Sequence, residues 1–132
     1  MKNLHQRVVR SLPRAATVCA FGLALTAIPS VAGAVTTLTA VVNANGTFVR
    51  GTPAGTTSSR IGLGEYRVVF SRNVHTCTFN ATVGSPNTIR PQGGNTRVYS
   101  MPGNAKGVAV ETGSQGEPEN RPFHLMVVCP TP

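Results

Sequence analysis

The sequence has no tryptophan and no aspartate, and it is poor in aromatic residues, which make up 5% of its 132 positions. The lack of aspartate excludes aspartate-based catalysis, and the lack of tryptophan excludes indole platforms for sugar rings. Its four acidic side chains are all glutamates, against twelve lysines and arginines, so the formal net charge is +8. This length indicates one domain at most.

The N-terminal part has the order of an export signal. Residues 1–14 carry basic side chains and no acidic one, residues 15–28 are almost entirely apolar, and small residues occupy 32–34. This order predicts cleavage between Ala34 and Val35. The apolar stretch of 14 residues is shorter than the roughly 20 that span hydrocarbon, so we expect no membrane span after cleavage. The absence of an Arg-Arg pair favours the general secretory pathway and a secreted product.

A leader at residues 1–34 changes the arithmetic for the predicted domain, residues 35–132. The leader contains four of the twelve basic side chains and one of the three cysteines, so the domain has eight basic and four acidic side chains, a net charge of +4. These basic residues form no cluster interleaved with aromatic residues, and we therefore expect no nucleic acid partner. Cys77 and Cys129, 52 positions apart, are predicted to form one structural disulfide in an oxidising compartment.

The domain reads as short strands separated by turns. Alternation is clearest at 77–83, where Cys77 and Phe79 begin an apolar face that threonines and an asparagine oppose. No segment sustains a helical period, so we predict an all-β fold, an antiparallel sandwich or flattened barrel of seven to eight strands. The disulfide is expected to close one end of its core, tying the C-terminal strand to a central one, within one sheet or across two. The expected strands are 35–42, 47–50, 60–63, 65–70, 77–83, 96–101, 107–112 and 123–129, and the expected loops are 51–59, 85–95 and 113–122.

Candidate catalytic groups are few. They are His75, His124, Glu65, Glu111, Glu117 and Glu119. The sequence has no Gly-x-Ser-x-Gly motif and no set of metal ligands at fitting spacings, so we predict neither catalytic residues nor a metal or cofactor. Tyr99, near a turn, and His124, on the outward side of its strand, are the candidate ligand contacts.

Three stretches of the domain together resemble a known group. They run from Val41 to Gly51, from Gly64 to Phe70 and from Arg121 to Cys129. The chain resembles a small secreted β-domain found among actinobacterial proteins, a group without an established activity. The resemblance implies export, a β fold and a paired-cysteine framework, and it supplies no catalytic residues.

These observations favour an exported, non-enzymatic β-domain that binds an extracellular or cell-surface macromolecule through its loops or an exposed sheet face. Two alternatives stay open. A small secreted hydrolase would require His75 or His124 to meet a serine or glutamate in a pocket. A cationic membrane-active protein would use the net positive charge, although no basic amphipathic helix is predicted. The oligomeric state is not predicted.

Overall fold

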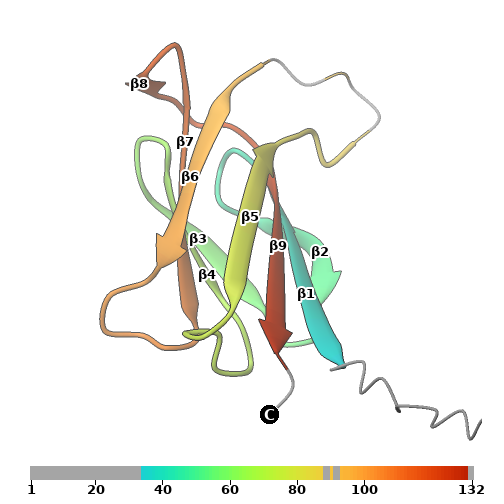
Figure 1. The fold of residues 1–132 in the computed structure, drawn as a ribbon. Coiled ribbons are helices and arrows are strands. Elements are labelled where there is room, and N and C mark those ends of the chain that lie inside the picture. The colour runs from blue at the N-terminus through green and yellow to red at the C-terminus, as the bar shows by residue number, and fades with distance from the viewer. Residues whose placement is uncertain (1–33, 88–89, 91–92, 131–132) are drawn as a thin grey trace, which may run out of the picture. The chain divides into compact units, whose positions relative to one another are not determined.

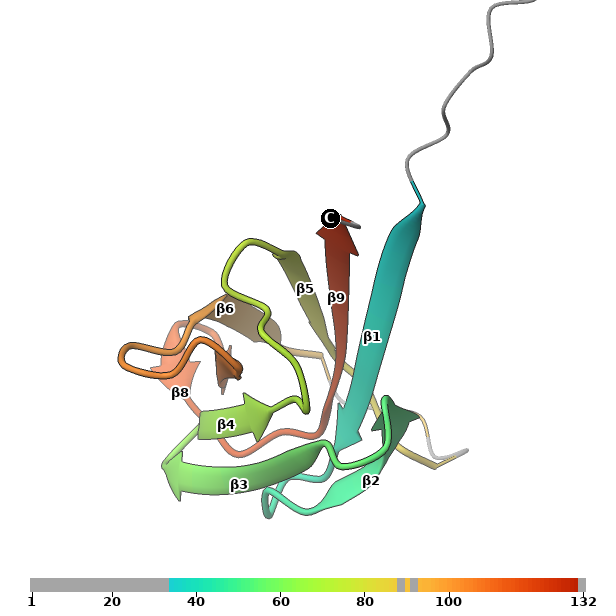
Figure 2. The same ribbon diagram turned by 90° about the horizontal axis from the view of Figure 1, so that it is seen from below.

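The structure is a computed structural model that describes residues 34–87, 90 and 93–130. The predicted export signal at 1–34 lies outside the described residues, except for Ala34. Within those ranges the chain forms nine strands in two antiparallel sheets, and it contains no helix long and apolar enough to cross a membrane. Figures 1 and 2 show the sheets as two layers from perpendicular directions.

The first sheet has the strand order β2-β1-β9-β5, and the second has the order β3-β4-β7-β6 with β8 paired to β7. The strands of the first sheet are β1 (Val35–Val42), β2 (Phe48–Thr52), β5 (Thr78–Val83) and β9 (Phe123–Pro130). Those of the second are β3 (Thr57–Gly62), β4 (Glu65–Val69), β6 (Asn95–Ser100), β7 (Gly107–Ser114) and β8 (Glu117–Pro118). The predicted all-β sandwich is confirmed, and the two-residue β8 brings the strands to nine.

The core lies between the sheets and follows the period-2 pattern of the sequence. On β9, Phe123 and every second residue after it are buried, while Tyr66, Val68 and the following Phe70 are buried on the side of β4. The rings of Tyr66 and Phe123 meet edge to face, with centroids 5.1 Å apart. Full burial of one such side chain stabilises the fold by about 1.5–3 kcal/mol, so this alternation sets the register of both sheets.

The turn between β1 and β2 joins the two layers. Gly46 has a φ of 89°, in the left-handed region that favours glycine, and the Gly46 amide donates to the Asn43 carbonyl at 2.8 Å. From the second sheet, the Ser58 hydroxyl donates to the Gly46 carbonyl at 2.7 Å, and the Tyr66 hydroxyl donates to the Ala44 carbonyl at 2.9 Å. An added Cβ at Gly46 would collide with the Arg60 amide nitrogen, so the close contact between turn and β3 requires glycine.

The predicted disulfide between Cys77 and Cys129 is confirmed, with an S–S distance of 2.07 Å and a Cα–Cα distance of 4.3 Å. It joins neighbouring strands within the first sheet, because Thr78 pairs with Val128 in the β5–β9 register. The expectation that the disulfide ties the C-terminal strand to a central one is wrong, because β9 is itself an inner strand and Cys77 directly precedes β5, the edge strand of this sheet. Beyond β5 the chain turns into the second sheet, where β6 pairs with β7 instead.

Two predicted loops are shorter than expected. The segment 51–59 was predicted to be a loop, but β2 continues to Thr52 and β3 begins at Thr57. In the segment 113–122, β7 continues to Ser114 and β8 pairs back on it. Both predictions relied on Gly, Pro, Ser and Thr content, and pairing to a neighbouring strand outweighs that local preference.

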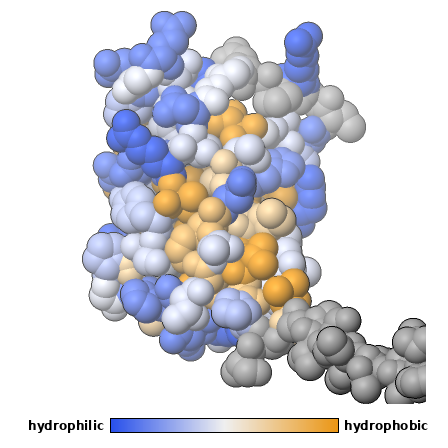
Figure 3. Space-filling view, viewed as in Figure 1, coloured by the Kyte–Doolittle hydropathy of each residue, from blue (hydrophilic) through white to orange (hydrophobic). Residues whose placement is uncertain are grey.

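The two sheets approach each other along the side where β5 lies beside β6. The Thr96 hydroxyl donates to the Ala81 carbonyl at 2.6 Å, linking one end of β6 to β5. Half-buried Phe79, Ala81 and Val98 pack against the core from these two strands. Figure 3 shows hydrophobic residues gathered over the middle of this view, where β5 lies between β6 and β9 in Figure 1.

Candidate functional site

The outer face of the second sheet carries two rows of side chains that point away from the core. Their positions follow from the inward direction of Tyr66, Val68, Val108 and Val110, because successive side chains on a strand point to opposite faces. The first row runs Arg67, Ala109, Tyr99 and the second runs Glu65, Glu111, Arg97, each from β4 across β7 to β6. Directly opposed side chains have Cβ atoms about 4.5–5.5 Å apart, so each row is in contact across the sheet.

Glu111 is the centre of a polar network on this face. The Tyr99 hydroxyl donates to Glu111 Oε1 at 3.0 Å, and Arg97 Nη1 lies 3.7 Å from Glu111 Oε2. The pKa of Tyr99 is raised, mainly by the hydrogen bond to the Glu111 carboxylate and to a lesser extent by desolvation. The phenol is therefore a hydrogen-bond donor at neutral pH. The Arg97 side chain is 75% exposed, and such a pair contributes about 1 kcal/mol at most. The network orients groups more than it stabilises the fold.

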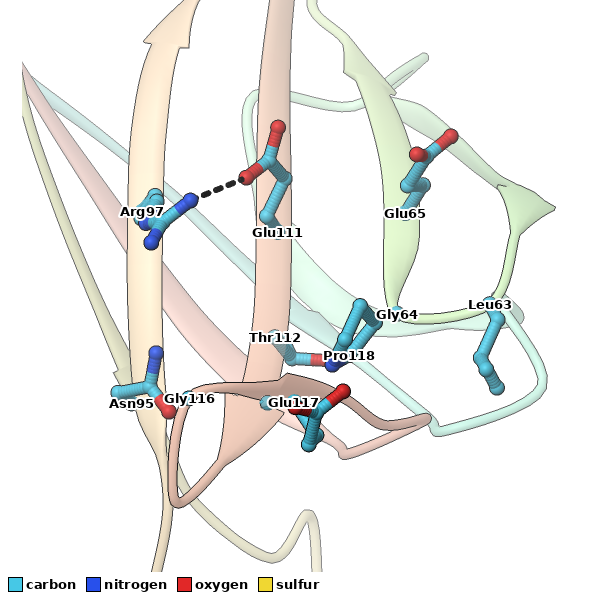
Figure 4. A pocket seen from close by; sticks show the side chains of 11 residues that line it. Leu63, Gly64, Glu65, Asn95, Arg97, Glu111, Thr112, Gly116, Glu117 and Pro118 are labelled. Carbon is cyan, nitrogen blue, oxygen red and sulfur yellow. Dashed lines mark ion pairs between the residues drawn. The ribbon is translucent and has the colours of Figure 1, made fainter.

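A cavity of about 130 Å³ lies beside this network, at the end of β7. Figure 4 shows Arg97, Glu111 and Glu65 on three strands, with Glu117 and Pro118 on the hairpin near them. Three of the four glutamates of the chain line this cavity, together with one arginine and the 62% exposed Leu63. The cavity is therefore mixed in character, with carboxylate, guanidinium and apolar groups.

The β7–β8 hairpin forms the end wall of the cavity. Its two-residue loop, Gln115 and Gly116, has φ values of 52° and 91°, and two positive φ values are typical of a type I′ turn. Gly113 on β7 allows the hairpin to fold close, because an added Cβ there would collide with the Glu117 carbonyl oxygen. The wall is thus built from backbone, and it places the Glu117 side chain at the cavity.

Thr112 anchors this wall from beneath. Thr112 is 3% exposed. Its hydroxyl donates to the Glu119 carbonyl at 2.5 Å and accepts from the Arg121 amide at 3.2 Å. Its own amide donates to the Gly64 carbonyl at 2.7 Å. Each such buried hydrogen bond is costly to leave unmade, so Thr112 holds the β3–β4 turn and the segment after β8 together.

Comparisons with known proteins were made for the whole chain. No protein family, no curated protein and no solved structure matches it. What the site can do follows from its own groups. Within the described ranges, no group of three histidines, cysteines or glutamates is placed to hold a metal ion.

The candidate residues predicted from the sequence fall into two groups. The structure brings Tyr99 together with Glu111 on the second sheet, and Glu65, Glu111 and Glu117 line one cavity, whose lining does not include Tyr99. Glu119 Oε2 forms an ion pair of 2.7 Å with Arg121 Nη2, so Glu119 is engaged with Arg121 while Glu117 lines the cavity.

The two candidate histidines, His75 and His124, do not line this cavity. His124 is on the outer face of the first sheet, half buried, and its Nε2 lies 3.1 Å from the Ser85 carbonyl oxygen. An added Cβ at Gly84 would collide with the His124 ring, so this side chain supports the segment after β5. His75 is exposed between β4 and β5, where its amide donates to the Asn73 side chain at 2.9 Å. Among the residues that the structure describes, neither imidazole is hydrogen-bonded to a serine hydroxyl or to a carboxylate.

The pairing of Glu65 with Glu111 was missed by sequence reasoning. Alternation predicts that each points outward, because Tyr66 and Val110 beside them point inward. Their contact depends on the β4–β7 register, which sequence patterns do not give.

Proposed function

We propose that this chain is an exported binding domain whose outer face on the second sheet binds a macromolecule of the cell surface or the extracellular space. The observation that carries the proposal is the exposed network of Tyr99, Glu111 and Arg97 beside a cavity on a disulfide-linked sandwich. Binding sites are commonly small sets of polar and aromatic groups on a rigid scaffold.

Three features support export. The first is the leader-like order of residues 1–34, and the second is the resemblance to small secreted β-domains of actinobacteria. The third is the Cys77–Cys129 disulfide, because such bonds persist in oxidising compartments. Export by the secretory pathway predicts that the protein recovered from culture medium begins at Val35 and contains no free thiol. N-terminal sequencing and a thiol assay test this, and an intact N-terminus on the recovered protein would contradict it.

The binding proposal is tested on intact producing cells with fluorescently labelled full-chain protein after secretion. Arg97→Glu places a third carboxylate beside Glu65 and Glu111, and we expect it to remove most of the cell-bound signal. Asn80→Glu, which also introduces one carboxylate, at an exposed position of the first sheet, is the control and should bind as the wild type does. Equal binding by both variants and the wild type would refute a role for this face.

Glycoside hydrolysis is a second candidate, favoured by the opposed register of Glu65 and Glu111. Retaining glycosidases use two carboxyl groups about 5–5.5 Å apart. Two observations favour binding instead: Glu65 is exposed, and Glu111 already accepts from Tyr99. A carboxyl group that keeps its proton at neutral pH needs apolar surroundings. Turnover of aryl glycosides that Glu65→Gln abolishes would establish hydrolysis.

The membrane-active alternative needs basic side chains gathered around apolar surface. On the face described above, Arg67 and Arg97 alternate with Glu65 and Glu111, and this balance does not favour anionic lipid.

A further inference from the structure

The shape of the proposed site comes from the small residues of its middle strand. On the outer side of β7, Ala109 lies between Arg67 and Tyr99, and Gly113 lies beyond Glu111. Ala109 is only 7% exposed although it faces outward, so its longer neighbours on β4 and β6 cover it. The small residues Ala109 and Gly113 thus lie on either side of Glu111, between longer side chains of β4 and β6, and we call this face, from Ala109 to the cavity beside β8, the trough.

Tyr99 offers a preformed aromatic surface on one side of this trough. Its side chain is 45% exposed, while its hydroxyl is held by Glu111 Oε1 at 3.0 Å. A tyrosine ring has few rotatable bonds, and the bond to Glu111 restricts it further, so little entropy is lost when a ligand lies on it. The electron-rich face of the ring attracts the C–H groups of a sugar ring.

The charges of the trough favour an uncharged ligand. Arg67 and Arg97 alternate with Glu65 and Glu111, and Glu117 adds a third carboxylate at the cavity. A polyanion would therefore meet more like charges than unlike ones, and a polycation would still meet two guanidinium groups. Carboxylate and guanidinium groups each present two or more hydrogen-bonding atoms in a plane. Such planar groups match the neighbouring hydroxyls of a saccharide.

An extended peptide is the competing occupant. Extended peptides add to a sheet through the free edge of a strand, where main-chain groups are unpaired. β7 has no such edge, because β4 pairs with it on one side and β6 on the other. The trough thus offers side-chain groups only, which suits a polysaccharide better than a peptide strand.

The cavity at the end of the trough sets how much of the ligand is enclosed. Its volume of about 130 Å³ exceeds the roughly 10–15 Å³ that one water needs, and it is smaller than the about 300–1,000 Å³ of pockets that enclose a whole ligand. It fits part of a longer chain, with Leu63 and Pro118 as apolar contacts at its rim.

We propose that the trough binds an uncharged polysaccharide, with one sugar ring on Tyr99 and a further residue of the same chain entering the cavity between Leu63 and Glu117. This rests on the proposed binding function and names the chemical class of its ligand. The groups that carry specificity are Glu111, Arg97 and Asn95, which line the cavity from β7 and β6.

The test uses the secreted full-chain protein and three fractions from the envelope of the producing cells: neutral polysaccharide, charged polysaccharide and protein. Binding to three defined neutral polysaccharides, dextran, galactomannan and xylan, is measured by affinity electrophoresis and calorimetry. We expect retention by the neutral fraction that changes little with salt, since no net charge is matched. Tyr99→Ala should weaken this binding at least about tenfold, which corresponds to the loss of one aromatic contact.

Met126→Ala is the matched control, because Met126 is also 45% exposed and lies on the outer face of the first sheet. It should bind as the wild type does, and Tyr99→Phe, which keeps the ring, should lose less than about threefold. Circular dichroism of each variant excludes misfolding as the cause. Retention by the charged or the protein fraction alone, or equal loss in Tyr99→Ala and Met126→Ala, would overturn the polysaccharide proposal. If intact cells still distinguish Arg97→Glu from Asn80→Glu in that case, the binding function stands without this ligand class.

Discussion

The outer faces of the two sheets differ in chemistry although the same alternation builds them. The outer face of the first sheet carries threonines together with apolar residues, which include Met126 and Val128 of β9. Its basic side chain, Arg50, donates from Nη1 to the Pro86 carbonyl at 2.8 Å, and His124 contacts the same segment through the Ser85 carbonyl. On this face Arg50 and His124 are both engaged in holding the segment after β5.

The face of the second sheet keeps its polar groups available. Arg67, Arg97 and Glu65 are exposed on β4 and β6, and Tyr99 is oriented by Glu111 without being covered. The inner faces fix the register through burial, which leaves the outward positions free to differ. The difference therefore separates a face that supports the structure from one that is open to a partner, and three experiments test that separation.

The largest effect is expected from removing the disulfide, which lies in the first sheet alone. Closing a loop of 52 residues contributes about 4 kcal/mol on the chain-entropy account, so Cys77→Ala/Cys129→Ala should lower the free energy of unfolding by about that amount. Urea unfolding followed by circular dichroism measures it. Reduced wild type provides the control and should unfold at a similarly low urea concentration.

The same variant tests whether the faces are independent. Under conditions where it remains folded, it should bind intact cells as the wild type does, because Tyr99 and Glu111 lie in the other sheet. Loss of binding by a folded double variant would show that the first sheet contributes to the site.

A smaller effect is expected from Thr112→Val, which keeps the shape of the side chain but removes its hydroxyl. The Glu119 carbonyl and the Arg121 amide would each lose a buried partner, and the free energy of unfolding should fall by about 1–3 kcal/mol. Because these bonds anchor the wall of the cavity, cell binding should weaken as well.

Thr56→Val is the matched control for this substitution. Thr56 is also buried, and its hydroxyl donates to the Pro53 carbonyl at 2.7 Å in the loop between β2 and β3. It should lose stability and keep binding. Equal weakening of binding by both variants would mean that general stability, and not the wall beside β8, controls the site.

The strands of this molecule can be predicted from the sequence because each one depends on a local pattern of residues. Seven of the expected strands overlap the observed ones closely, because alternation at Phe123, Leu125 and Val127 or at Tyr66 and Val68 is a local pattern with one buried face. Neighbouring residues carry the information for these strands. The disulfide is predictable for a different reason, since Cys77 and Cys129 are the two cysteines that the predicted domain contains.

The site was not predictable in the same way. Glu65 and Glu111 are far apart in the sequence, and they meet only because β4 and β7 pair in one register. The hairpin at Gln115 and Gly116 also escaped prediction, because glutamine is not among the residues that favour a positive φ. The sequence singled out Tyr99 because it lies near a turn, and the fold alone supplies its partner Glu111.

The smallest effect concerns Tyr66, whose hydroxyl links the second sheet to the turn of the first through the Ala44 carbonyl. Tyr66→Phe should lower the free energy of unfolding by about 1 kcal/mol at neutral pH, through loss of this bond. Burial is the main cause that raises the pKa of Tyr66 above its ordinary value of about 10, because it disfavours the phenolate.

This shift predicts a pH dependence with a definite sign. Since the folded state holds the phenol proton more tightly, the contribution is complete below about pH 10 and is lost as the pH rises through the raised pKa of the folded state. The difference in unfolding free energy between wild type and Tyr66→Phe should therefore shrink as the pH rises above about 10, measured by urea unfolding at each pH. Tyr99→Phe, at an exposed position, should change stability little over the same range. A difference between wild type and Tyr66→Phe that stays constant with pH would show that the Tyr66 hydroxyl is not desolvated where the two layers meet.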